Sequence, residues 1–281
     1  MKQYYHIYTK GLEEDIIFRD REDFVVGMNY VPISVLQAHL CMLAFVLMSN
    51  HFHFVVYAGK SEAERFIYIF KRLIGRYIAS KYHVRILHKV QTSCVTVPLA
   101  DDGIKRLISY VLNNPVKAGV NCLPQNYEWG SGRCYFSNIV LNGRLLSTLG
   151  VREACTVFRS KVELPSHYIL NDSGYIEPSS YVDVNAVERI YRHAKSFEYY
   201  LSISNKRADK TAVGYSDALL LQILTEILEK RYESISLGEL NEENLHRLIV
   251  DFRRQFNCMP KQLARIFHLP LSMIVNLLES Q

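Results

Sequence analysis

Alternating hydrophobic and polar positions divide the first 136 residues into strands and amphipathic helices. Residues 3–10, "QYYHIYTK", are rich in aromatic and β-branched residues and predict a first strand. The segment "REDFVVGMNYV" predicts a short helix with acidic residues in its first turn. Two apolar runs follow, "CMLAFVLMS" and "HFHFVVYAG". They meet at Ser49-Asn50, which predicts two strands joined by a tight hairpin.

Two later segments have the period of amphipathic helices. Ser61, with Glu64 three residues on, predicts a capping box that opens a helix running to about Lys81. Asp101 and Asp102 precede "GIKRLISYVLNN", a second helix that we expect Pro115 to end. The apolar stripes of the two helices are Ile67, Phe70, Ile74 and Ile78, and Ile104, Leu107, Ile108 and Val111.

With a further strand expected within "ILHKVQTSCVTV", the order of elements is β-α-β-β-α-β-α. This alternation predicts an α+β domain over residues 1–136, a ferredoxin-like (split βαβ) antiparallel sheet with helices packed on it. Residues 137–182 are expected to form an irregular extension. A mostly α-helical domain is expected over 183–281, from helical patterns near 184–203, 216–232, 241–256, 260–267 and 271–279.

The last two helical patterns, residues 260–279, admit two interpretations. "KQLARIFHLPLSMIVNLL" can form two helices around a short turn with Ala264 at their crossing, as in a DNA-binding helix-turn-helix. A glycine is usual four residues after that alanine, whereas this chain has His268. A helical hairpin without a DNA-reading role therefore stays open.

The positive charge of the chain is concentrated in its first half. Residues 1–136 hold 16 Lys+Arg and 11 Asp+Glu, whereas the remainder holds 17 of each, so the whole net charge of +5 lies in the first part. Residues 65–100 contain seven basic residues and no acidic one. Such a stretch can simply be a solvated surface, but it also indicates a polyanionic partner.

The composition also indicates the cellular compartment of the protein. Six cysteines are scattered without a C-x-x-C pair, which is typical of reduced thiols and not of a zinc site or a disulfide framework. We see no apolar run of the length that crosses a bilayer, and the N-terminal residues lack the apolar stretch of a signal peptide. We therefore expect a cytoplasmic protein without a membrane partner.

Two short polar patterns carry candidate chemistry. Because side chains alternate along a strand, His51 and His53 share one face, opposite a plain core face. Tyr110 lies off the apolar stripe of its helix, with Asn114 at i+4 and Arg106 one turn earlier. Taken alone, each feature has a structural explanation: a surface histidine, a half-buried tyrosine or a helix-ending asparagine.

Together, these patterns resemble the HUH single-strand transposases with one catalytic tyrosine, especially the REP-associated tyrosine transposases. The resemblance is carried by "YYHIYTKG", "IIFRDREDF", "LMSNHFHFVV", "YVLNNPVKAG" and "YEWGSGR", in that order over residues 4–133. H-x-H alone is a weak signal. Combined with "YVLNNPVKAG" some 57 residues later, it is a specific one.

The resemblance implies a metal-dependent nuclease and transposase. It implies that His51 and His53, completed by Asn114, hold a divalent metal, Mg²⁺ or Mn²⁺, with open positions for phosphate oxygens. It also implies that the Tyr110 hydroxyl attacks the scissile phosphate, giving a 5′-phosphotyrosine and a free 3′-OH, so that strands rejoin without ATP.

The expected partner is single-stranded DNA that bears hairpins. Basic residues expected to contact its phosphates are Arg65, Lys71, Arg72, Arg76 and Arg106. Tyr68, Tyr77 or Tyr82 could stack on bases. A homodimer is left open.

Two other functions stay open at this stage. Many relatives have a tryptophan- and arginine-rich stretch where this chain has "ILHKVQTSCVTV", a departure that favours a domesticated, non-cleaving DNA-binding protein on the same fold. A metallohydrolase with H-x-H on a strand is a third possibility, although no further ligand motif supports it.

Overall fold

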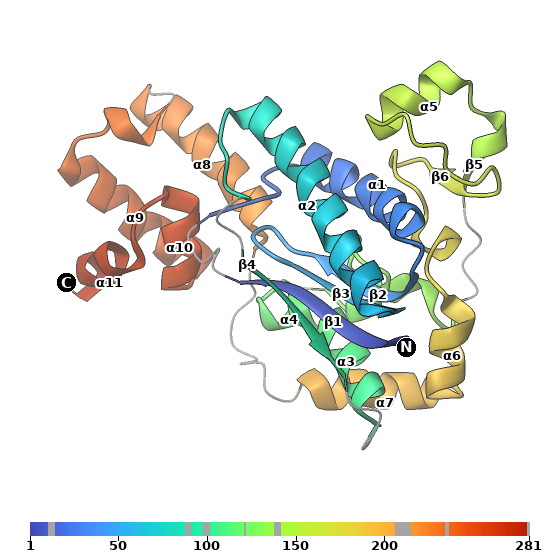
Figure 1. The fold of residues 1–281 in the computed structure, drawn as a ribbon. Coiled ribbons are helices and arrows are strands. Elements are labelled where there is room, and N and C mark those ends of the chain that lie inside the picture. The colour runs from blue at the N-terminus through green and yellow to red at the C-terminus, as the bar shows by residue number, and fades with distance from the viewer. Residues whose placement is uncertain are drawn as a thin grey trace.

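The computed structural model describes residues 1–10, 15–87, 91–97, 102–120, 122–137, 142–205, 215–233 and 236–279. The protein is α+β: an antiparallel four-stranded sheet with a remainder that is mostly helical (Figure 1). The strands of this sheet are β1 (Gln3–Lys10), β2 (Cys41–Leu47), β3 (Phe52–Ala58) and β4 (Gln91–Thr96). Two short strands, β5 (Gly143–Leu145) and β6 (Ile169–Asn171), pair elsewhere in the chain.

The strand order β2-β3-β1-β4 places the first strand between the third and the fourth. β1 pairs antiparallel with both β3 and β4, and its register sets Tyr8 opposite His53 and His6 opposite Val55. β2 and β3 form the predicted hairpin, closed by the Met48 N–H donating to the His51 carbonyl at 2.8 Å. His51 therefore lies at the end of the turn, one residue before β3 begins.

Helices cover both faces of the sheet, as Figure 1 shows. The helices are α1 (Arg21–Ala38), α2 (Lys60–Tyr82), α3 (Gly103–Leu112), α4 (Asn114–Lys117), α5 (Val151–Phe158), α6 (Val184–Tyr191), α7 (Ala194–Asn205), α8 (Asp217–Tyr232), α9 (Glu242–Phe256), α10 (Pro260–Phe267) and α11 (Leu271–Glu279). α1 and α2 lie on one face. α3 lies on the other face and packs in turn against α7.

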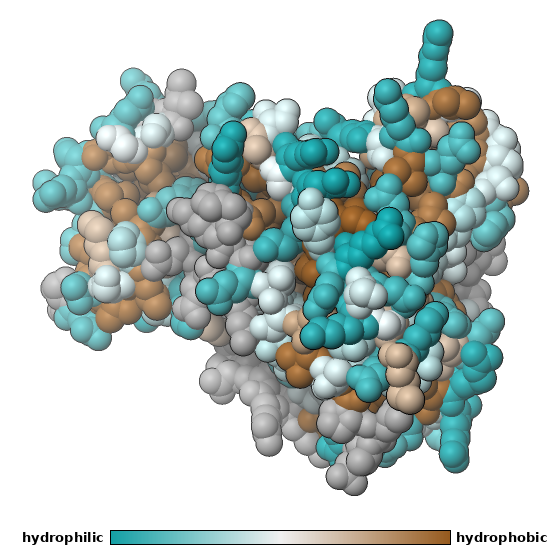
Figure 2. All heavy atoms as spheres, viewed as in Figure 1, coloured by the Kyte–Doolittle hydropathy of each residue, from teal (hydrophilic) through white to brown (hydrophobic). Residues whose placement is uncertain are grey.

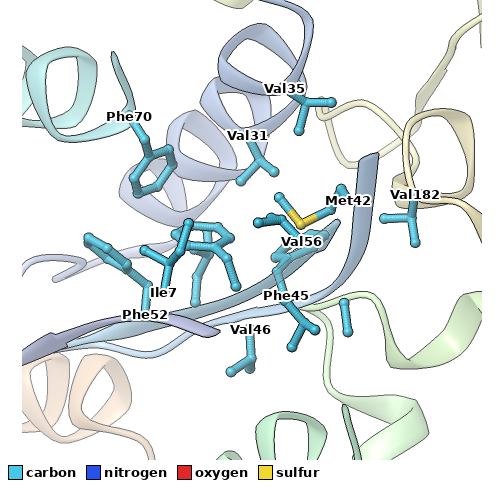
Figure 3. Packing of buried hydrophobic residues seen from close by; sticks show 14 of the residues in the cluster. Ile7, Val31, Val35, Met42, Phe45, Val46, Phe52, Val56, Phe70 and Val182 are labelled. Carbon is cyan, nitrogen blue, oxygen red and sulfur yellow. The ribbon is translucent and has the colours of Figure 1, made fainter. Parts of the chain in front are cut away.

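The apolar face of β3 determines which helices lie on which side. Phe52 and Phe54 are fully buried, and their rings lie edge-on to Phe70 of α2. Figure 3 shows Phe52, Phe70 and Ile7 on this side of the sheet. Since side chains alternate along a strand, His53 points to the opposite face, toward α3.

The structure corrects several predicted helix boundaries. α1 is longer than the short helix expected and continues through Pro32, in a stretch that is mostly buried. The predicted capping box at Ser61 and Glu64 is wrong: α2 begins after Gly59, whose N–H donates to Glu62 at 2.8 Å. Pro115 does not end α3, which stops at Leu112. It lies in the first turn of α4, where its missing N–H costs no helical hydrogen bond.

Buried hydrophobic residues form two clusters, one around the sheet and one among α8–α11. α6 and α7 contribute Val187, Tyr191, Phe197 and Leu201 to the first cluster. The helical pattern predicted near 184–203 is thus two helices, separated around Arg192, which has a positive φ of 71°. The domain boundaries at 136 and 182 stay a prediction. None of the helices in the described residues is sufficiently long and apolar to span a membrane.

Candidate functional site

The two predicted histidines lie side by side at the beginning of β3. His53 is buried and His51 is partly exposed, with their ring centroids 5.1 Å apart and the planes nearly perpendicular. His6, from the neighbouring strand β1, completes a row of three imidazoles, and its ring stacks on His53 with centroids 5.2 Å apart. The face shared by His51 and His53 is thus the imidazole face that the alternation predicted.

Hydrogen bonds engage the Nδ1 atom of both β3-hairpin histidines. His51 Nδ1 lies 2.7 Å from Asn50 Oδ1 and donates to it, because an amide oxygen only accepts. His53 Nδ1 lies 3.0 Å from His6 Nε2. If neutral His53 donates from Nδ1 to His6, its Nε2 keeps a lone pair. Neutral His51, which donates from Nδ1 to Asn50, likewise keeps a lone pair on Nε2. Metal-binding histidines are held in this way, by a second hydrogen bond that orients the ring.

Burial keeps these imidazoles neutral. It lowers the pKa of His6 to about 4. It also lowers the pKa of His51 to about 4, with a further decrease from the Arg265 cation, opposed by Asp217 and by a side-chain hydrogen bond with Asn114. The pKa of His53 lies well below its ordinary value because of burial, and the neighbouring His51, His6 and Lys117 lower it further. Neutral imidazoles have the lone pairs that metal binding requires.

Tyr110 reaches this site from α3. Because it lies off the buried stripe, its side chain is 41% exposed, while Ile108 and Val111 beside it are buried. Its ring lies edge-on to His53 and His6, with centroid distances of 5.9 and 6.1 Å. The prediction that Tyr110 lies off the apolar stripe is therefore confirmed.

Contacts with α6 and α7 hold α3 against the sheet. Ser109 Oγ and Tyr191 Oη lie 2.8 Å apart, and Tyr191 donates to the Lys105 carbonyl at 2.7 Å. Asn113, which separates α3 from α4, donates to the Leu201 carbonyl at 3.0 Å. These hydrogen bonds, along α3 and just after its end, fix the position of the helix and hence of Tyr110.

Asn114 lies between Tyr110 and His51. Its Nδ2 donates to the Tyr110 carbonyl at 2.9 Å and to the Val111 carbonyl at 3.3 Å, so Oδ1 is the atom that faces His51. Because Nδ1 of His51 already donates to Asn50, this oxygen can accept a hydrogen bond from the ring only when the ring is protonated. The sequence left the direction of Asn114 open because a proline follows it. The α3–α4 junction turns the side chain toward the histidines.

Lys117 is a site residue that the sequence reading missed. Its Nζ lies 4.2 Å from the centroid of the Tyr110 ring, and its charge acts on His53. Lys117 is seven residues after Tyr110, but α3 ends at Leu112 and Lys117 lies on α4, so helical spacing alone does not place the two on one face. His6 shares a face of β1 with Tyr4 and Tyr8, by the same alternation that puts His51 and His53 on one face.

The side chains at this site that could donate to a cation are two imidazoles and one amide. In the part of the chain that the structure describes, no three His, Cys, Asp or Glu side chains are placed to share one metal. A cation here would depend on His51 and His53, with the Asn114 amide oxygen as the third donor. Nitrogen and neutral oxygen donors of this kind suit Mg²⁺ less well than Mn²⁺, which accepts imidazole more readily.

The predicted DNA-binding residues form two groups on opposite faces of the sheet. Lys71, Arg72 and Arg76 of α2 line a groove of about 670 Å³ that continues to Arg85 and β4. Arg72 lies 5.6 Å from the ring centroid of the exposed Tyr68. Figure 2 shows hydrophilic side chains along the outer face of α2, in the centre of the view.

The other two basic residues lie outside this groove. Arg65 is exposed on α2, two turns before Arg72. Arg106 is exposed on α3, on the Tyr110 side of the sheet. Hydrogen bonds from Lys105 and Tyr200 hold the pKa of Asp102 below its ordinary value, and the Arg106 cation contributes to this shift.

Comparison of the chain with protein-family models, with curated proteins and with solved structures found no match. The functional assignment of this site depends on its own residues and their geometry.

Proposed function

We propose that this protein is a metal-dependent, single-tyrosine DNA transposase or endonuclease that acts on single-stranded, hairpin-bearing DNA. The order β1-α1-β2-β3-α2-β4 with sheet order β2-β3-β1-β4 supports a ferredoxin-like, split-βαβ catalytic domain. The sequence resemblance to the HUH transposases, in which this arrangement is expected, supports the same function.

One observation carries the proposal: the Tyr110 phenol lies beside His53, which neighbours His51, and both of these imidazoles are oriented through Nδ1. The Tyr110 ring is 5.9 Å from that of His53 although 57 residues separate them in the chain. An exposed tyrosine on an amphipathic helix has many possible neighbours. A neighbour with two neutral imidazoles and an amide oxygen is what phosphodiester cleavage with a bound cation requires.

The proposed reaction uses the hydroxyl of Tyr110 as the nucleophile. Its Oη forms a bond to phosphorus, the bond from phosphorus to the 3′-oxygen breaks, the phenolic proton is released and the 3′-oxygen gains a proton. A cation held by His51, His53 and Asn114 would withdraw electron density from the phosphate. Lys117, next to the Tyr110 ring, would offset the charge of the phosphate oxygens.

The position of the basic groove affects how DNA would bind. Because the groove on α2 lies across the sheet from Tyr110, a single short strand cannot occupy both. A substrate with a duplex stem and a single-stranded end, which passes the edge strand β4, satisfies this geometry. Aromatic and cationic side chains together, as at Tyr68 and Arg72, are typical of nucleic-acid contacts.

The test is incubation of the full-length protein with labelled hairpin DNA and Mn²⁺ or Mg²⁺, followed by a denaturing gel. We expect a protein-linked DNA band that is absent for Tyr110→Phe and depends on the metal. Tyr199→Phe is the matched control, since Tyr199 is also an exposed helical tyrosine but lies on α7. It should form the adduct at the wild-type rate.

The outcomes separate the candidate functions. Hairpin binding without any adduct, equal for wild type and Tyr110→Phe, would identify a non-cleaving DNA-binding protein. An adduct that persists in Tyr110→Phe would exclude this tyrosine as the nucleophile. Hydrolysis of small phosphoesters without a covalent species would favour a metallohydrolase.

A further inference from the structure

The turn that carries His51 is held by residues that are distant in sequence. The Ser49 carbonyl accepts hydrogen bonds from the N–H groups of Ile17 and Phe18, at 2.7 and 2.9 Å. The side-chain hydroxyl of Ser49 donates to Asp217 Oδ2 at 2.6 Å. Asn50 and His51 follow directly, and their side chains bond to each other. Movement of Ser49 would therefore move the first imidazole of the candidate site.

Asp217 belongs to the helical unit α8–α11, and it is buried. Its side chain is 4% exposed, at the first position of α8, and its charge is paired with Arg265 of α10, whose Nε lies 2.9 Å away. Gln262, one turn before Arg265, donates to the other carboxylate oxygen at 2.9 Å. A carboxylate with this many donors has one orientation, because turning it would leave a buried charge unpaired.

A second contact joins the same two parts of the chain. Ile16 is 1% exposed and packs in the hydrophobic cluster of α8–α11, while the next two residues donate to Ser49. The turn is thus fixed to the helical unit through its carbonyl and through its hydroxyl. The charges of Arg265 and Asp217 are both close enough to act on His51.

We infer that Asp217 and Arg265 are positioning residues: through Ser49 they set the turn that orients His51, so the helical unit α8–α11 is part of the metal site's support. Hydrogen-bonded partners behind a metal ligand commonly change metal affinity by 10–100-fold when removed. The unit that ends in the predicted helix-turn-helix is coupled to the site of chemistry and is more than a tethered extension. The expected effect on metal affinity rests on the proposed function, in which His51 binds a cation.

The experiment uses full-length protein and two readouts. Mn²⁺ affinity is measured from the free-ion electron paramagnetic resonance signal, and the ring resonance of His51 is followed by NMR at fixed pH after assignment with His51→Gln. Ser49→Ala removes only the hydroxyl, and Arg265→Lys keeps the charge but loses the fork of donors. Arg231→Lys is the matched control, since Arg231 makes an exposed ion pair with Asp251 in the same unit.

We expect Ser49→Ala and Arg265→Lys to weaken Mn²⁺ binding about 10-fold. Both should also shift the His51 resonance, whereas Arg231→Lys changes neither. The urea midpoint of Ser49→Ala should stay near that of wild type, which separates positioning from unfolding. Unchanged affinity and unchanged His51 resonance in both variants would overturn the inference. If wild type binds no Mn²⁺, the metal site of the proposed function fails, and the His51 resonance alone decides the positioning.

Discussion

Lys81 is the cation at the centre of a cluster of carboxylates, and its replacement by methionine is a direct test of how α1 and α2 are joined. Its Nζ lies 2.6 Å from Asp20, 3.0 Å from Glu22 and 2.9 Å from Asp23. Asp20 and Glu22 are about half exposed, with side-chain exposures of 48% and 51%, so each pair contributes little. Asp23 is fully buried, so its pairing with Lys81 dominates the cost.

The expected loss of unfolding free energy depends on the hydrogen bonds that Asp23 keeps when Lys81 is replaced. Removing one partner of a buried ion pair costs about 3–5 kcal/mol when the remaining charge has no other support. Asp23 still accepts from Tyr77 Oη at 2.8 Å, from Tyr82 Oη at 2.7 Å and from the Arg19 N–H at 2.7 Å. These donors stabilise part of the charge, so we expect Lys81→Met to lower the free energy of unfolding by about 2–3 kcal/mol.

The assay is urea unfolding at pH 7, with Lys60→Met as control on the same helix. Lys60 lies 3.9 Å from Glu64, with 78% and 59% of the side chains exposed, so its replacement should cost less than about 0.5 kcal/mol. In an Asp23→Asn background, Lys81→Met should cost less than in wild type, because no buried charge is then left unpaired. The reasoning is refuted if Lys81→Met costs no more than Lys60→Met.

Three further predictions concern charge at the site and on its surroundings. At saturating DNA, Lys117→Met should slow formation of the Tyr110–DNA adduct about 100-fold and leave the affinity for the hairpin nearly unchanged. Lys117→Arg should restore part of the rate. Equal rates for wild type and both variants would show that Lys117 takes no part in the reaction. Burial raises the pKa of Asp20, but the hydrogen bonds from Lys81, the Asp23 N–H and Tyr82, together with the Lys81 charge, outweigh burial and hold this pKa below its ordinary value of 3.8. The stability that Asp20 contributes is thus present above pH 3.8 and lost as the pH falls toward the folded-state pKa, so the difference in unfolding free energy between wild type and Asp20→Asn should vanish in acid; a constant difference would contradict this. Arg72→Gln should reduce the slope of log K against log salt for hairpin binding by about 0.7–0.9, and an unchanged slope would place DNA elsewhere.

Most of the elements were predictable from local pattern. Aromatic and β-branched composition identified β1, and two apolar runs that meet at Ser49-Asn50 identified the β2–β3 hairpin. The 3.6-residue period identified α2, α3 and α8–α11, because each of these helices buries one continuous face. The errors lie where burial overrides local signals. α1 continues through Pro32 because the residues around it are packed on both sides, and Pro115 begins α4 instead of ending α3.

Charge shows the limit of local reasoning most clearly. Lys81 and Arg72 belong to the same acid-free stretch and have the same meaning in the sequence. In the folded chain, three carboxylates at the start of α1 surround Lys81, whereas Arg72 lines a groove beside Tyr68. A run of basic residues gives the sign of a surface, but it does not tell which of its members are neutralised by an acid from another segment.

The candidate site divides in the same way. Spacing alone puts His51 and His53 on one face and sets Asn114 one turn after Tyr110, because the geometry of strands and helices is periodic and local. That the tyrosine lies against the imidazoles depends on α3 packing under the sheet, and that Ser49 is held by Asp217 depends on a contact across 168 residues. Such contacts depend on which faces of the helices and the sheet pack against one another. Periodicity along the chain predicts the faces, but it does not predict how they pair.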